Sequence, residues 1–351
     1  MGILFWYDNL SREIIQNGVL QNFVEKGITG VTTNPIIFRN AVSGSETYDD
    51  VIKKYNDCSA EGVCWRLMVD DVRDACDILK NNYESSNFQT GYVSIELNPF
   101  YANSFEESVN QARSLWKEIN RQNLMIKVPA TEAGYRIIRK LISEGINVNV
   151  TLIFSLSSYL KACESYLLGL EDMLEKGGDI SQVRSVASFF VSRVDVLANQ
   201  RVKAASISSQ FENKLGIWNC MLAYHLYKRI FGSSRFTKLL KSGAKTQTLL
   251  WASTGVKDPA LEADLYLTAL SFEDTAFTLP DQTLKRALET DWLTNYRIAE
   301  LTDEETLRRY FDEFDSSGFT FEYLSYELLC QGLVLFETAF LDLLKSIESK
   351  F

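Results

Sequence analysis

The feature that most constrains this chain is the alternation of short apolar runs with longer stretches of helical periodicity. Each apolar run is short enough to be a strand buried on both faces. The stretches between them, such as 10–26, 105–121 and 156–174, place apolar residues three or four positions apart. We therefore expect strands at residues 3–7, 30–34, 92–96, 124–127, 146–151, 185–191, 248–252 and 276–279.

Eight strands that alternate with helices predict an α/β fold with a parallel sheet, and the length of 351 residues favours a closed (β/α)8 TIM barrel. A doubly wound open sheet is the alternative, but the glycine-rich phosphate loops typical of that fold are missing from the sequence. We expect extra helices after strand six, at about 196–245, and at the C-terminus, at about 281–351. No repeat or Pro/Gly-rich linker divides the chain, so a single domain over 1–351 is expected.

Charge and cysteine content restrict the possible partners. The formal net charge of −10 and the pI of about 4.9 argue against nucleic acid or an anionic membrane as partner. The six cysteines have no zinc-site spacing and the one histidine, His225, lies in a helical stretch, so no metal site is expected. With no signal-peptide pattern and no run of 18 apolar residues, a cytoplasmic protein with reduced thiols is predicted.

A lysine closes the fourth predicted strand, in the apolar segment Leu124-Met-Ile-Lys-Val-Pro-Ala-Thr131. Keeping a buried amine charged costs free energy, and a neutral lysine can attack a carbonyl and form a Schiff base. Alternatively, Lys127 could extend its amine to solvent from the end of the strand. The sequence at this position leaves both interpretations open.

Polar residues also lie near the C-terminal ends of neighbouring strands, where barrel enzymes carry their chemistry. Each could instead be a helix cap or a structural hydrogen-bonding group, as Asn34 before Pro35 illustrates. A buried Glu96 needs a partner, and Lys127 on the next strand is available for either a structural or a functional pair. The strand-end set consists of Asp8, Asn34, Glu96, Lys127, Asn149 and Thr151.

A second group follows the later strands, whose loops often bind phosphate in barrels. Arg193 has the planar guanidinium that suits phosphate, and Lys257 adds a second cation. Such residues are individually most often surface charges. The candidates for a phosphate site are Ser188, Arg193, Ser253 and Lys257.

Taken together, these segments resemble the transaldolase family of Schiff-base aldolases, in its longer bacterial type. The resemblance spans nearly the whole chain and rests on seven motifs in the family's order. They are Trp6-Tyr-Asp-Asn-Leu-Ser-Arg12, Gly30-Val-Thr-Thr-Asn-Pro-Ile-Ile-Phe38, Val93-Ser-Ile-Glu96, Ile126-Lys-Val-Pro-Ala-Thr131, Val148-Asn-Val-Thr-Leu-Ile-Phe-Ser155, Ala187-Ser-Phe-Phe-Val-Ser-Arg-Val-Asp195 and Leu250-Trp-Ala-Ser-Thr-Gly-Val-Lys257.

The resemblance implies a (β/α)8 barrel and a cofactor-free reaction of the pentose phosphate pathway. A dihydroxyacetone unit passes from sedoheptulose 7-phosphate to glyceraldehyde 3-phosphate, which yields erythrose 4-phosphate and fructose 6-phosphate. It implies Lys127 as the Schiff-base lysine, Asp8 as general acid/base, and Glu96 with Thr151 as holders of a catalytic water. Asn34, Asn149, Ser188 and Phe190 would contact the sugar, and Arg193 the phosphate.

Two departures from the family pattern leave the substrate open. Gly255 stands where shorter members carry an arginine, and Lys257 could replace that phosphate contact. Phe277 stands where longer members have a polar residue, which could alter the acceptor pocket or only local packing. The alternative is therefore a transaldolase-like aldolase with an altered or unphosphorylated substrate. A non-enzymatic barrel is a third possibility, and the chain is expected to be a monomer or homodimer.

Overall fold

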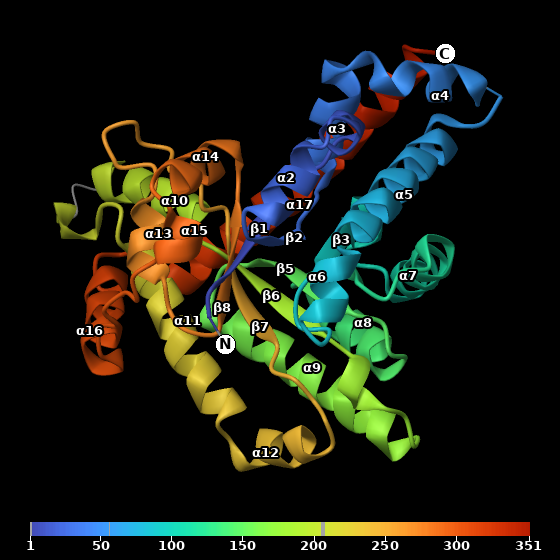
Figure 1. Ribbon diagram of the computed structural model, residues 1–351. Helices are drawn as coiled ribbons and strands as arrows, with labels where there is room; N and C mark the ends of the chain where they lie inside the picture. Colours follow the sequence, from blue (N-terminus) through green and yellow to red (C-terminus); the bar gives the residue numbers. More distant parts are fainter. Residues whose placement is uncertain (1, 56, 205–207) are drawn as a thin grey trace.

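The computed structural model describes residues 2–55, 57–204 and 208–351. Within them, parallel strands close into a barrel in chain order, with β1 paired to β8 (Figure 1). This closure confirms the predicted (β/α)8 barrel. The strands are β1 (Leu4–Tyr7), β2 (Ile28–Val31), β3 (Tyr92–Glu96), β4 (Leu124–Pro129), β5 (Val148–Ile153), β6 (Ser185–Phe190), β7 (Thr248–Ala252) and β8 (Thr275–Leu279).

Most helices lie outside this barrel, as expected for crossover connections between parallel strands. The predicted insertion after strand six is present as α10 to α12, and the predicted C-terminal helices as α14 to α17. The bounds are α1 (Arg12–Gln16), α2 (Val19–Glu25), α3 (Pro35–Gly44), α4 (Asp49–Lys54), α5 (Ala60–Ile78), α6 (Lys80–Ser85), α7 (Phe105–Ile119), α8 (Glu132–Ser143), α9 (Leu156–Glu175), α10 (Ser192–Ala204), α11 (Leu215–Phe231), α12 (Ser234–Lys241), α13 (Leu265–Leu270), α14 (Asp281–Glu289), α15 (Trp292–Asn295), α16 (Glu304–Asp315) and α17 (Phe321–Glu348).

The helix expected over residues 10–26 is wrong as a single element. It is divided into α1 and α2 at Gly18, whose φ of 70° is left-handed. Glycine adopts this conformation without the steric penalty that a side chain brings. The fourth strand also continues beyond Lys127 to Pro129, so the lysine lies inside the strand rather than at its end.

Alternation along the strands divides the core into two parts. Outward side chains such as Phe5 and Ile126 belong to the larger apolar cluster, which packs against the helices. Inward side chains such as Trp6 and Met125 belong to a second cluster that includes the barrel interior. The same alternation sends Lys127, two residues after Met125, toward the inside of the barrel.

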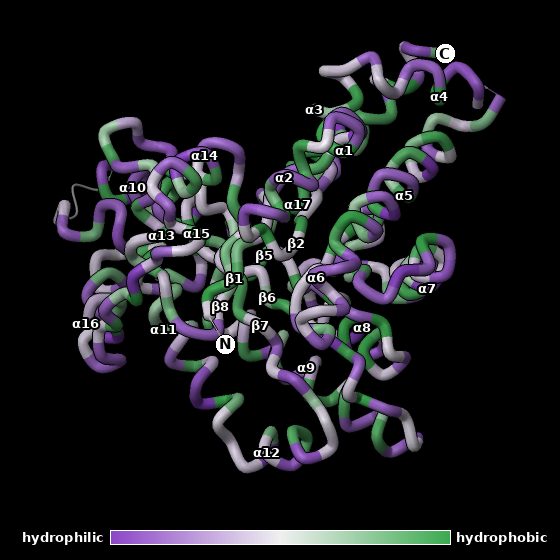
Figure 2. Tube along the Cα trace, viewed as in Figure 1, coloured by the Kyte–Doolittle hydropathy of each residue, from purple (hydrophilic) through white to green (hydrophobic). Residues whose placement is uncertain are grey.

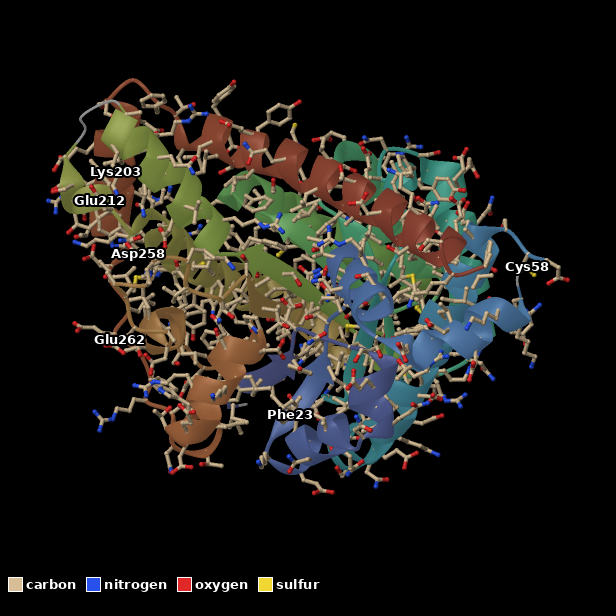
Figure 3. The ribbon with its side chains drawn as sticks, turned by 90° about the horizontal axis from the view of Figure 1, so that it is seen from above. Phe23, Cys58, Lys203, Glu212, Asp258 and Glu262 are labelled. Carbon is tan, nitrogen blue, oxygen red and sulfur yellow. The ribbon has the colours of Figure 1, made fainter. Side chains whose placement is uncertain are left out.

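The helices give the molecule two distinct ends. In Figure 1, α3, α4, α5 and the C-terminal half of α17 extend together beyond the barrel. Cys58 lies at this end, and Lys203 with Glu212 at the opposite end (Figure 3). Hydrophilic and hydrophobic segments alternate along α5 and α7 (Figure 2), as in helices with one buried face. No helix in the described part of the chain is long and apolar enough to cross a membrane.

Close packing inside the barrel requires Gly30 on β2. A Cβ atom there would lie 2.4 Å from the ring of Trp6, which is 2% exposed. We predict that Gly30→Ala lowers the free energy of unfolding by about 1–3 kcal/mol, because an overpacked ring must move. Gly44→Ala is the control, since nothing lies within 4 Å of its added Cβ. Urea unfolding measures both, and equal midpoints for the two variants would contradict the packing argument.

Candidate active site

A cavity of about 360 Å³ opens at the C-terminal ends of the strands. This is the end of a barrel where binding sites form, because eight strand ends and their loops converge there. Most of the residues predicted from the sequence line this one cavity, although they come from across the chain. They are Asp8, Asn34, Lys127, Thr151, Ser188, Phe190, Arg193, Ser253 and Lys257.

Lys127 is buried, at 5% exposure, so its side chain does not extend to solvent. Its Nζ donates a hydrogen bond of 2.8 Å to the carbonyl oxygen of Thr33 and lies 3.1 Å from Glu96 Oε1. Glu96 and Lys127 are paired in register on β3 and β4, so both side chains point inward at the same level. The strand pairing thus brings the predicted pair together.

Glu96 does not line the main cavity but a smaller one of about 20 Å³ beside it, which Lys127 and Thr151 also line. Burial raises the pKa of Glu96, and the charge of Lys127 opposes that rise. Among the described residues, neither Glu96 oxygen nor the Thr151 hydroxyl has a hydrogen-bond partner of good geometry. A space of this volume with several polar groups suits one water molecule.

Asp8 follows β1 and accepts a hydrogen bond from Thr32, which in turn contacts Thr278; neither threonine was predicted from the sequence as a site residue. Thr32 Oγ1 donates to Asp8 Oδ1 at 2.7 Å, and Thr278 Oγ1 lies 2.5 Å from Thr32 Oγ1. Because the Thr32 hydroxyl already donates its hydrogen bond to Asp8, the hydroxyl of Thr278 must be the donor in the bond between the two threonines. Burial raises the pKa of Asp8, while the Thr32 bond and the charges of Lys127 and Arg193 act against the rise. Thr32 and Thr278 could have been predicted as site residues, because each lies near the end of a predicted strand.

The two predicted amides occupy different environments. Asn34 caps α3, accepting a hydrogen bond from the Ile37 amide at 3.0 Å, and also lines the cavity. Its cap and its place in the site are therefore compatible. Asn149 is fully buried below the cavity, with Nδ2 donating to Ser94 Oγ at 3.0 Å and Oδ1 accepting from Ser188 Oγ at 2.7 Å. Ser188 thus links Asn149 to the cavity wall.

Arg193 and Lys257 place two cations on the cavity wall. Neither forms an ion pair with a carboxylate in the described ranges, so both can serve an anionic ligand. Burial lowers the pKa of Arg193, and its guanidinium carbon lies 5.4 Å from the centre of the Phe190 ring. Ser253 Oγ lies 2.9 Å from Ser192 Oγ, a bond that ties the loop after β7 to the start of α10.

Gly255 and Phe277, the two residues that depart from the family pattern, lie in different environments in the structure. Gly255 lines the cavity, and a Cβ atom there would lie 3.6 Å from Lys257 Nζ. Phe277 is fully buried on the outer side of β8, where its ring stacks 6.0 Å from that of Phe5. The possibility that Phe277 alters the pocket is therefore wrong, because it affects only packing outside the barrel. The inward residue of that strand end is Thr278.

Phe336 on α17 also lines the cavity, although no sequence pattern predicts it as a site residue. It lies far from every strand in the chain and belongs to an ordinary apolar helical stripe. Only the packing of the C-terminal helix over the barrel brings it to the site. Within the described residues, no group of three or more His, Cys, Asp or Glu is placed to hold a metal ion.

The structure combines a closed parallel barrel with a buried amine, a carboxylate 3.1 Å from it and a second carboxyl group in the same cavity, an arrangement in which a lysine can act as a nucleophile. Comparison with known sequences agrees. Residues 5–347 match the profile described as Transaldolase/Fructose-6-phosphate aldolase. The chain therefore belongs to the transaldolase/fructose-6-phosphate aldolase family.

Several relatives match over almost their whole length. A protein of Nostoc sp. named Transaldolase 2 is 39% identical over 363 residues, which covers 99% of this chain and 95% of the relative. A transaldolase of Mycolicibacterium smegmatis is 39% identical over 359 residues with the same coverage. A Transaldolase 2 of Streptomyces coelicolor is 39% identical over 357 residues, again with 99% and 95% covered.

The Thr32 bond favours the ionised form of Asp8, so we predict that Thr32→Val raises the pKa of Asp8 further. The carboxyl signal should then titrate at a higher pH than in the wild-type protein. Carbon NMR of labelled aspartate, assigned with Asp8→Asn, measures this shift. Thr29→Val is the control, because that hydroxyl donates to the Phe5 carbonyl. A shift to lower pH, or none, would count against the bond as a determinant of Asp8 ionisation.

Proposed function

We propose that this protein is a transaldolase that transfers a dihydroxyacetone unit between ketose and aldose phosphates through a Schiff base on Lys127. The observation that carries the proposal is the buried amine 3.1 Å from Glu96 in a cavity that also contains Asp8 and two cations. Family membership and the names of the relatives support it. The specific sugars, sedoheptulose 7-phosphate and glyceraldehyde 3-phosphate, are part of the proposal.

Formation of the Schiff base starts with a proton transfer. The ammonium of Lys127 gives one proton to Glu96, whose pKa burial raises, and the pair becomes neutral. The amine then attacks the ketone carbon of the donor sugar. Glu96 and Thr151 handle the water that leaves the carbinolamine, which fits their open hydrogen-bonding groups and the small cavity beside them.

Cleavage of the carbon–carbon bond uses Asp8. The iminium withdraws electrons from the donor chain, Asp8 takes the proton of the reacting hydroxyl, and the bond breaks to an aldose phosphate and an enamine on Lys127. An acceptor aldehyde then adds to the enamine carbon, with Asp8 returning the proton. A raised pKa suits this role, because a general acid/base acts best with a pKa near the working pH.

Asn34 supports the proposal by offering its amide donor to the sugar hydroxyls, since its oxygen is held by the cap of α3. Asn149 and Ser188 hold each other below the cavity and would position the intermediate from there. Phe190 adds an apolar surface to the wall. Action in the cytoplasm, in the pentose phosphate pathway, and a monomer or homodimer state remain predictions.

The Schiff base can be tested directly. We predict that borohydride reduction in the presence of fructose 6-phosphate adds a three-carbon unit to Lys127, because reduction traps the iminium. Peptide mass spectrometry locates the adduct. Lys127→Ala should lose both adduct and turnover while remaining folded, whereas Lys161→Ala, outside the cavity, should keep both. A folded wild-type protein that gives no adduct under conditions that label a known transaldolase would refute the mechanism.

The two cations distinguish the proposal from the alternative of an unphosphorylated substrate. We predict that Arg193→Met and Lys257→Met each raise KM for phosphorylated acceptors by about 10–100-fold, as expected when a charged hydrogen bond of about 1.5–3 kcal/mol is lost. KM for glyceraldehyde, which has no phosphate, should change little. Steady-state kinetics on both acceptors measure the difference. Equal effects on the two acceptors would favour the alternative aldolase.

A further inference from the structure

The long C-terminal helix α17 forms part of the active-site wall. Figure 3 shows it running across the molecule as one continuous helix. Two of its side chains, Leu333 and Phe336, reach the site, and Phe336 lines both the main cavity and the small cavity beside Glu96. The Phe336 ring is buried, at 6% exposure, and lies 5.8 Å from the guanidinium carbon of Arg193.

Gly332 permits this close approach. A Cβ atom there would lie 2.9 Å from Leu152 Cδ2 and 3.6 Å from Arg193 Nη1, so a side chain would require Leu152 or the helix to shift. Phe336 follows one helical turn later and lies on the same face of α17. The glycine therefore allows α17 to pack closely against the barrel next to the phenyl ring.

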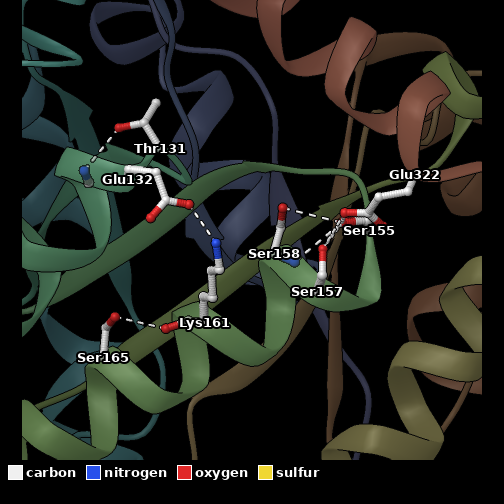
Figure 4. Close-up of polar contacts among 9 residues, drawn as sticks. Thr131, Glu132, Ser155, Ser157, Ser158, Lys161, Ser165 and Glu322 are labelled. Carbon is white, nitrogen blue, oxygen red and sulfur yellow. Dashed lines mark hydrogen bonds and ion pairs between the residues drawn. The ribbon is translucent and has the colours of Figure 1, made fainter.

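The helix is anchored by two contacts in its first two turns and by one just beyond its C-terminal end. Near its start, Glu322 accepts hydrogen bonds from Ser157 and, at 3.3 Å, from Ser155 at the N-terminus of α9 (Figure 4). Glu327 pairs with Arg201 of α10 at 2.8 Å. Near the C-terminus, Lys350 pairs with Asp49 at 2.6 Å. These contacts join α17, the helix that carries Phe336, to α9, α10 and Asp49.

Phe336 is an apolar wall of two adjoining spaces, both of which Lys127 and Thr151 also line. Glu96 belongs to the smaller space of about 20 Å³, which suits one water. Asp8 and Arg193 belong to the cavity of about 360 Å³, which would admit the sugars. The covalent intermediate, attached to Lys127, would extend past this ring.

We propose that Phe336 is a specificity-determining residue, which decides whether the three-carbon enamine is transferred to an aldehyde or released as free dihydroxyacetone. This inference rests on the proposed function. In release, the enamine carbon takes a proton, one water adds to the iminium carbon, and the carbon–nitrogen bond breaks to regenerate the amine. In transfer, the same enamine carbon bonds to the carbonyl carbon of the acceptor aldehyde instead. Water then hydrolyses the new iminium, which releases a ketose three carbons longer than the acceptor and regenerates the amine.

The two outcomes compete for one carbon atom, and release depends on proton delivery to it. Phe336 lines both spaces that Lys127 lines, so its apolar ring would limit the water that could carry a proton to the enamine carbon, and the ring also lies next to the Arg193 guanidinium. Both effects favour transfer. Removal of the ring should therefore increase release more than it changes the formation of the intermediate.

The experiment compares Phe336→Ala and Phe336→Leu with Val334→Ala, which alters a side chain 60% exposed on the same helix. With fructose 6-phosphate as donor, dihydroxyacetone release is measured without acceptor, and sedoheptulose 7-phosphate formation with erythrose 4-phosphate. We expect the ratio of release to transfer to rise about tenfold in Phe336→Ala. It should rise less in Phe336→Leu and stay unchanged in Val334→Ala.

Borohydride trapping separates this proposal from the proposed function on which it rests. If the wild-type protein forms no adduct on Lys127, the proposed function itself fails. If the variants form the adduct and their release and transfer rates fall together, Phe336 has only a structural role and the proposal is overturned. Thermal unfolding checks folding. If Phe336→Ala is unfolded, the ratio in Phe336→Leu decides, and a value equal to that of the wild type overturns the proposal.

Discussion

The ion pair between Lys127 and Glu96 is the interaction on which the rest of the site depends. Two opposite charges lie 3.1 Å apart at 6% side-chain exposure, and burial of either charge alone would be strongly unfavourable. Each group makes the burial of the other possible. The two groups are close enough to exchange a proton, which the proposed Schiff-base mechanism requires.

The barrel provides the register that this pair needs. Because adjacent parallel strands β3 and β4 align Glu96 with Lys127, and β4 and β5 align Lys127 with Asn149, inward groups from successive strands form one layer. Asp8 reaches the same cavity from β1, on another part of the closed ring. Closure of the barrel therefore brings residues from the first and middle thirds of the chain into one space.

The C-terminal helix completes the site from outside the barrel. Its anchors on α9 and α10 and at Asp49 fix Phe336 next to Arg193, so the last part of the chain shapes a cavity built by the first. Arg193 and Lys257 lie near this helix, because both also line a surface hollow with its Leu328 and Leu335. Two cations in the cavity of a buried amine would suit the phosphate and the carbonyl of the proposed sugar phosphates.

Sequence patterns were enough to predict the barrel and most of the residues that line the cavity, because buried strands and strand-end polar residues are local signals. Lys127, Glu96, Asp8 and Arg193 could be named from motifs alone. Tertiary structure decided what local patterns do not encode: that Phe277 faces outward, that Thr278 and Thr32 support Asp8, and that Phe336 reaches the cavity. The direction of a side chain at a strand end depends on the register of its neighbours, and a contact between distant helices depends on packing, so neither is written in any short segment.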